Sequence, residues 1–97
     1  MSDKKFDVIT FGRSSIDLYS QNIGSPFNDI KGFDAFVGGS PLNIAVGCAR
    51  LGVNASLLTA VGNDKVGEFI LNFLNGEGVN THCIPVKNGT RSSAVVL

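Results

Sequence analysis

The stretch GGSPLNIAVGCARLG, residues 38–52, decides the fold because it combines a glycine pair, a helix start and a helix stop. Ser40 is a good N-cap, Pro41 suits the first helical position, and Gly52 suits the position just past the end. The residues between are apolar nearly all round, which predicts a buried helix. Gly47 lies inside this helix and costs it about 1 kcal/mol relative to alanine, which predicts close packing of another backbone there.

The segments on either side of this helix predict strands. Residues 6–12 and 55–61 are short β-rich runs bounded by glycine, so we expect two buried strands. Residues 18–23 and 32–37 flank a turn signal and predict two exposed strands.

A second helix is expected over residues 65–75, with Asp64 as its cap. Five apolar side chains give this helix a stripe at helical spacing: Val66, Phe69, Ile70, Phe73 and Leu74. Two more strands are expected at 81–86 and 92–97. The alternation of strands and helices predicts an α/β fold with parallel crossovers, and we expect the sheet to be incomplete C-terminally because the chain stops inside an apolar strand.

Composition argues against several classes of function. The 97 residues are 43% hydrophobic and 16% charged, which suits a folded domain or a piece of one. Eight basic and eight acidic residues give a net charge of zero without a basic stripe, so no nucleic-acid partner is expected. Cys48, Cys83 and His82 lack metal-site spacing and predict no metal ligand. No apolar run suits a signal peptide or a membrane span, so we expect a cytoplasmic protein with no membrane partner and with reduced thiols.

Four residues are candidates for ligand binding. Gly38 and Gly39 precede a helix, where glycines expose backbone N–H groups and let a ligand approach closely. Asn43 offers a donor and an acceptor, and Asp17 follows the first strand, where the carboxyl ends of strands face a crevice. A carboxylate beside an amide suits a sugar or polyol. A glycine pair and an Asp after a strand are also common in simple turns, so a purely structural role stays open.

Three runs resemble the N-terminal half of the ribokinase-like (PfkB) carbohydrate kinases, and together they cover almost the whole chain. Residues 39–45 with Gly52 resemble the family's signature, residues 62–67 resemble its V-G-x-D-x-x-G run, and residues 12–17 resemble the segment with its substrate aspartate. The resemblance implies a ribokinase-like α/β fold with a partial parallel sheet, flanking helices and a small β lid. Residues 1–97 would be the substrate-binding part of a kinase domain, with lid strands near residues 18–23, 32–37 and 81–97.

The same resemblance implies roles for individual residues. Asp17 and Asn43 would hydrogen-bond substrate hydroxyls, and the glycine pair would supply backbone contacts to the same sugar. Arg13 and Arg91 are further candidates, because a guanidinium fork suits the carboxylate of a sugar acid. A solvated surface arginine is the plainer interpretation of each. Many relatives form a homodimer through the lid, and we expect the same here.

Catalysis is expected to need more than this chain. In the family, the γ-phosphoryl group of ATP moves with Mg²⁺ to a sugar hydroxyl, and the base is the Asp of a C-terminal G-A-G-D motif. That motif does not occur in these residues. The resemblance therefore implies no catalytic residue, no bound ATP or Mg²⁺ and no activity for the 97-residue chain alone.

Alternatives remain both for the branch of the family that the chain resembles and for the class of protein. Residues 12–19 with 38–45 most resemble the branch that phosphorylates 5-dehydro-2-deoxygluconate in bacterial myo-inositol catabolism, but ribokinases, fructokinases and 2-keto-3-deoxygluconate kinases share much of this half. A dinucleotide-binding oxidoreductase would need G-x-G after the first strand, where Gly12 is instead followed by Arg13. A non-catalytic sugar-binding module that ends at Leu97 would leave an exposed sheet edge prone to aggregation.

Overall fold

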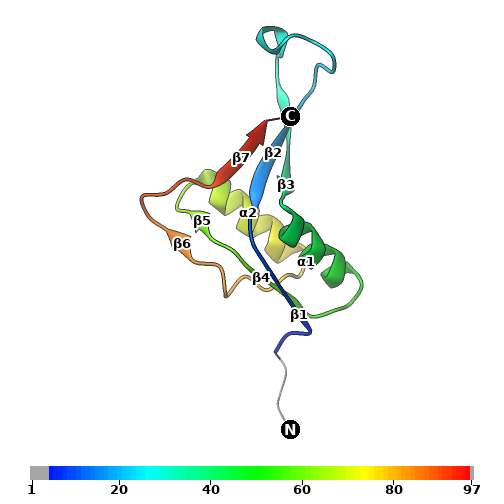
Figure 1. The fold of residues 1–97 in the computed structure, drawn as a ribbon, viewed down its shortest axis with the longest axis vertical. Coiled ribbons are helices and arrows are strands. Elements are labelled where there is room, and N and C mark those ends of the chain that lie inside the picture. The colour runs from blue at the N-terminus through cyan, green and yellow to red at the C-terminus, as the bar shows by residue number, and fades with distance from the viewer. Residues whose placement is uncertain (1–4, 97) are drawn as a thin grey trace.

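The computed structural model describes residues 5–96, which form an α/β body and a small projecting sheet (Figure 1). In the body, strand β1 (Val8–Phe11) runs parallel to β4 (Ala55–Leu58), and helix α1 (Ser40–Arg50) packs on both strands. Parallel strands with an intervening helix confirm the predicted α/β class.

The small sheet is built from strands in the order β3–β2–β7 and projects away from the body (Figure 1). Its central strand β2 (Ser15–Ser20) pairs antiparallel with β3 (Phe33–Gly38) and parallel with β7 (Ser93–Val96). A single 3₁₀ turn, η1 (Phe27–Asp29), lies in the loop at the far end of the β2–β3 hairpin.

The second half of the body follows β4. Strand β5 (Val61–Gly62) leads into helix α2 (Lys65–Gly76) and pairs in parallel with β6 (Val86–Lys87). Asp64 caps α2 as predicted, because its side chain accepts a hydrogen bond from the N–H of Gly67.

The hydrophobic core is formed by α1, β4, β5, α2 and the segment after α2. Its buried side chains are Leu42, Ala45, Val46, Ala55, Leu57, Val61, Ile70, Leu74, Val79 and Ile84. Each helix therefore buries one face in this core.

Three expectations for α1 are wrong. Gly39, with φ of 106°, is the N-cap, and Ser40 is already inside the helix with no capping bond from its side chain. The helix is not buried all round, because Ile44 is 53% exposed. Gly47 is exposed, and a Cβ there would meet nothing within 4 Å in the part of the chain that the structure describes. The predicted close approach of another backbone is therefore not found.

The strand predictions also need correction. Strand β1 is not fully buried, because Ile9 is 56% and Phe11 78% exposed. The first strand of the small sheet begins at Ser15, three residues before the predicted start, so Asp17 lies inside it and not in a turn. Residues 81–86 form mostly turns and irregular chain, with only the last of them in β6. The strand predicted at 92–97 is present as β7 over Ser93–Val96, and Leu97 lies outside the described residues.

Candidate functional site

The glycine pair joins the small sheet to α1. Gly38 is the last residue of β3, and Gly39 is the N-cap of α1. Gly39 lies at positive φ, and a Cβ on it would overlap the backbone carbonyl of Arg13. The N–H of Asn43 donates to the carbonyl oxygen of Gly39 at 2.9 Å, which closes the first helical turn. Asn43 is therefore held one turn above this junction.

Asp17 lies directly over Gly38. Its carboxylate occupies the space where a Cβ of Gly38 would be, so a larger residue at position 38 would displace it. The hydroxyl of Ser15, which is 1% exposed, donates to Oδ1 of Asp17 at 2.7 Å. A buried donor from the same strand therefore orients this carboxylate.

These side chains border a shallow hollow of about 440 Å³ between the small sheet and the first turn of α1. It is lined by Asp17, Tyr19, Phe36, Val37 and Asn43. The rings of Tyr19 and Phe36 meet edge to face, with centroids 5.5 Å apart. A carboxylate and an amide beside aromatic surface offer hydrogen bonds to hydroxyl groups and contact to the C–H face of a sugar.

The structure gathers part of the predicted site and leaves two residues outside it. Asp17 and Asn43 line the hollow, with Gly38 under the carboxylate and Gly39 at the helix start. Arg13 and Arg91 are exposed and do not line this hollow: Arg13 lies between β1 and β2, and Arg91 lies between β6 and β7.

Sequence reasoning missed three residues that matter for this site. Tyr19 shares a strand face with Asp17 because it lies two residues further on, a spacing that could have pointed to it. Phe36 lies opposite Asp17 in the β2–β3 register, and Ser15 donates to Asp17. Neither relation is visible until the strand bounds and the register are known.

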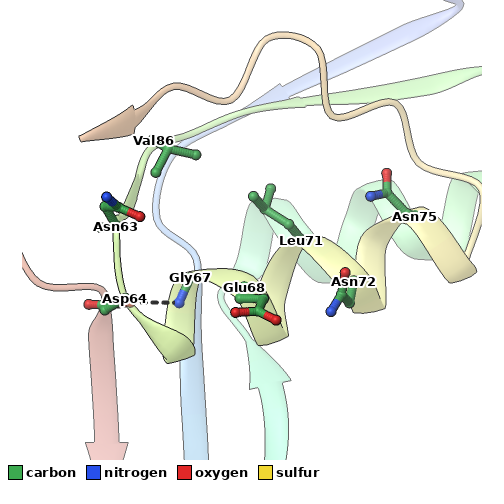
Figure 2. Close-up of a pocket in the computed structure, with 9 residues that line it drawn as sticks. Asn63, Asp64, Gly67, Glu68, Leu71, Asn72, Asn75 and Val86 are labelled. Carbon is green, nitrogen blue, oxygen red and sulfur yellow. Dashed lines mark hydrogen bonds between the residues drawn. The ribbon is translucent and has the colours of Figure 1, made fainter. Parts of the chain in front are cut away.

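A second hollow, of about 350 Å³, lies beside α2 and is lined mainly by polar side chains (Figure 2). Figure 2 shows Asn63, Glu68 and Asn72 among the side chains that line it, with the capping bond from Gly67 to Asp64 dashed. Neither the residues that line this hollow nor those that line the first include a lysine or arginine.

Asp64 also holds the chain just before β7. Its Oδ2 accepts from the N–H of Ser92 at 2.9 Å, and its Oδ1 accepts from the Ser92 hydroxyl at 2.8 Å and from the N–H of Gly67 at 2.7 Å. These bonds, the one from the Ser92 N–H foremost, lower the pKa of the Asp64 carboxyl. Within the described residues, the G-x-D-x-x-G run at 62–67 therefore holds the chain before β7 against the start of α2.

Within residues 5–96, no three His, Cys, Asp or Glu side chains gather closely enough to hold a metal ion. Neither described helix has the length and apolar character needed to span a bilayer.

Residues 5–97 match the family model described as pfkB family carbohydrate kinase. The chain is 36% identical over 93 residues to the 5-dehydro-2-deoxygluconokinase of Bacillus velezensis, covering 96% of this chain and 28% of that protein. It is 42% identical over 89 residues to the 5-dehydro-2-deoxygluconokinase of Clostridium tetani, covering 91% of this chain and 26% of that protein. The chain thus spans little more than a quarter of these curated relatives.

Solved structures of similar fold include two sugar kinases. An uncharacterized sugar kinase from Pyrococcus horikoshii, solved in complex with ATP, matches with a TM-score of 0.86 and 36% identity over 92% of this chain and 29% of that chain. The fructokinase of Halothermothrix orenii matches with a TM-score of 0.85 and 31% identity over 93% of this chain and 32% of that chain.

Proposed function

Because this chain belongs to the pfkB family of carbohydrate kinases, we propose that it is the N-terminal, substrate-binding part of a longer, ATP-dependent sugar kinase. Its fold is the partial ribokinase-like α/β fold of that family, with a small sheet beside the body. In this proposal the small sheet is the lid over the substrate, and the ATP-binding part and the catalytic base belong to the rest of the protein. The 97-residue chain alone is then inactive.

The single observation that carries the proposal is the hollow shared by Asp17 and Asn43. A carboxylate accepts hydrogen bonds from two neighbouring hydroxyls, and an amide both donates and accepts, so the pair suits a polyhydroxylated substrate. Gly38 and Gly39 bring the backbone at the start of α1 close to the same hollow.

The proposed contribution of these residues to phosphoryl transfer is positioning. ATP with Mg²⁺, bound elsewhere in the whole protein, supplies the phosphoryl group. Asp17 and Asn43 hold the sugar so that one hydroxyl faces that group, and the aromatic pair Tyr19 and Phe36 covers the sugar on the lid side. Fixing the two reactants in this way is a large part of catalysis in phosphoryl transfer.

We propose 5-dehydro-2-deoxygluconate as the substrate, and hence a place in myo-inositol catabolism. The support is the resemblance of residues 12–19 and 38–45 together with the names of the relatives from Bacillus velezensis and Clostridium tetani. Arg13 and Arg91 are proposed partners for an acidic substrate; because both lie outside the hollow, their side chains must reach toward it on binding.

Fructose is the second candidate substrate, supported by the likeness to a fructokinase structure. Ribose and 2-keto-3-deoxygluconate follow from the wider family resemblance. A non-catalytic sugar-binding module is the remaining alternative, and sugar binding by a soluble, monomeric 97-residue chain would favour it.

A homodimer through the lid and a cytoplasmic location complete the proposal. Dimerisation is supported by the apolar face of the small sheet, which carries Leu18, Ala35 and Val96 in neighbouring strands. A reducing compartment is supported by Cys48 and Cys83, which are both free thiols in the structure.

The deciding experiment is ATP-dependent phosphorylation by the whole protein, with each of the four sugars offered separately in the presence of Mg²⁺. The expected result is the highest kcat/KM with 5-dehydro-2-deoxygluconate. A higher kcat/KM with fructose would replace the proposed substrate, and ADP release without sugar phosphate in all four assays would overturn the proposed kinase function.

A further inference from the structure

Ser92 lies where the lid meets the body, and it is hydrogen-bonded to two segments of the body. Its N–H and its hydroxyl both donate to the Asp64 carboxylate, at 2.9 and 2.8 Å. Its hydroxyl oxygen also accepts from the N–H of Gly62 at 2.9 Å. Ser92 is the residue that precedes β7, and its bonds connect the start of this strand to the end of β5 and to the start of α2.

The close contact between Ser92 and the body depends on two glycines of the body, Gly62 and Gly67. A Cβ on Gly62 would come within 2.5 Å of the carbonyl oxygen of Thr90 and within 2.8 Å of the Ser92 nitrogen. A Cβ on Gly67 would overlap the carbonyl oxygen of Gly62 and lie 3.1 Å from the Ser92 hydroxyl. The tight fit indicates that the backbone before β7 has one defined position against the body.

Strand β7 in turn borders the strand that carries Asp17. Ser93 pairs with Ser15 and Val95 pairs with Asp17 in the parallel β2–β7 register. Ser15 donates to the Asp17 carboxylate that lines the hollow. Only two residues therefore separate Ser92 from Val95, the residue that pairs with Asp17.

The helix cap alone does not explain these bonds. The N–H of Gly67 already gives Asp64 its capping bond, at 2.7 Å, and this bond does not involve Ser92. The two donors of Ser92 bond the same carboxylate and in addition hold the start of β7. In Ser92→Ala the Gly67 N–H still has its acceptor on Asp64, so the variant removes the hydroxyl of Ser92 and not the capping residue.

We propose that Ser92 is a positioning residue for the substrate site: it anchors the lid strand β7 to the body and thereby holds Asp17 in place. This inference rests on the proposed sugar-kinase function. Ser92→Ala removes the hydroxyl and its two bonds, whereas Ser92→Thr keeps the hydroxyl. Arg50→Ala is the matched control, because it removes a bidentate hydrogen-bonded link to Glu77 between the C-terminal ends of α1 and α2 and not at the lid.

The test measures hydrogen exchange and kinetics in the whole protein. For Ser92→Ala we expect amides of β7 and β2 to exchange about tenfold faster without substrate, and KM for the sugar to rise about tenfold with KM for ATP unchanged. Ser92→Thr should restore both values, and Arg50→Ala should change neither.

The possible results separate the anchor from the proposed function. Unchanged exchange in β7 and an unchanged sugar KM in Ser92→Ala would overturn the inference, and so would an equal rise in both KM values, which indicates general loosening. A wild-type protein that phosphorylates no sugar would overturn the proposed function, whereas faster exchange of β7 in its Ser92→Ala variant would still support the anchor.

Discussion

The two oxygens of Asp17 have different surroundings. Oδ1 accepts from the buried hydroxyl of Ser15, and within residues 5–96 no protein donor reaches Oδ2. This arrangement leaves Oδ2 for a ligand while Ser15 fixes the plane of the carboxylate. Hydrogen bonds to a charged group contribute about 1.5–3 kcal/mol, so the loss of this carboxylate should be measurable as weaker binding.

Asp17→Ala should raise the dissociation constant of the sugar about tenfold or more in the whole protein, because the charged acceptor is lost. The measurement is calorimetric titration of the sugar without ATP. Asp29→Ala is the control, since Asp29 is an exposed carboxylate in η1 outside the hollow. Unchanged affinity in Asp17→Ala would remove Asp17 from the site.

Gly39 and Gly47 should respond in opposite directions to alanine. Gly39→Ala should lower the free energy of unfolding by about 2–4 kcal/mol, because positive φ strains the new residue and its Cβ overlaps the Arg13 carbonyl. Gly47→Ala should raise it by about 0.5–1 kcal/mol, since Gly47 is an exposed helical position. Urea unfolding of both variants of the whole protein checks this, and a loss of stability in Gly47→Ala would contradict the exposed position.

At the scale of the elements, the stability of α2 depends on the charge of its capping residue, Asp64. The pKa of Asp64 is lowered by the bonds from Ser92 and Gly67, so its contribution is fully present above the ordinary pKa of about 4 and is lost as the pH falls through the lower folded value. The free energy of unfolding should therefore fall on acidification below about pH 4.

Asp64→Asn should flatten this acid dependence, because the side chain at position 64 then no longer titrates. The measurement is urea unfolding at a series of pH values in the whole protein. Asp29→Asn is the matched control and should keep the wild-type slope, and an equal slope in Asp64→Asn would show that other carboxylates cause the acid sensitivity.

Prediction was most accurate where the signal lay within one segment, as in α2, and least accurate where pairing with a distant strand decides the structure, as in residues 81–86. The cap and apolar stripe of α2 lie within one segment, and its predicted bounds differ from the observed ones by a single residue. Residues 81–86 have apolar character, but only the end of this run finds a parallel partner, in β5, so most of it is irregular. For the site, Asp17 and Asn43 carry a sequence signal, while Phe36 enters through the β2–β3 register.

On the scale of the molecule, several large apolar side chains remain uncovered. They lie on β1, on the small sheet and in the loops beside them: Ile9, Phe11, Tyr19, Ile23, Phe27, Phe36 and Val96. Exposed apolar patches of this kind commonly mark surfaces that other chains or further segments cover. The proposed dimer makes a prediction about the apolar face of the small sheet, and the proposed remainder of the kinase makes a separate prediction about β1.

Ala35→Asp should weaken the proposed dimer by at least tenfold. Ala35 is exposed and pairs with Leu18, so an aspartate there introduces a charge into the apolar face of the small sheet. Light scattering of the whole protein over a range of concentrations measures the change in mass. Ser25→Asp, in the exposed loop of the lid, should leave the dimer intact, and a monomeric wild-type protein would contradict dimerisation itself.

A substitution at Phe11 tests whether the rest of the protein covers strand β1 of the body. Its side chain is 78% exposed here, and substitution of such a surface residue ordinarily changes the free energy of unfolding by at most about 0.5 kcal/mol. If the remainder of the kinase packs against β1, Phe11 is buried in the whole protein, and Phe11→Ser should cost about 3 kcal/mol.

Urea unfolding of the whole protein measures this cost, with Leu51→Ser as the control at the exposed C-cap of α1. We expect a large loss for Phe11→Ser and a change within about 0.5 kcal/mol for Leu51→Ser. Equal, small effects at both positions would mean that β1 stays an exposed edge. The substrate-binding part would then lack the cover that the proposed ATP-binding part supplies, and the proposed division of the kinase would fail.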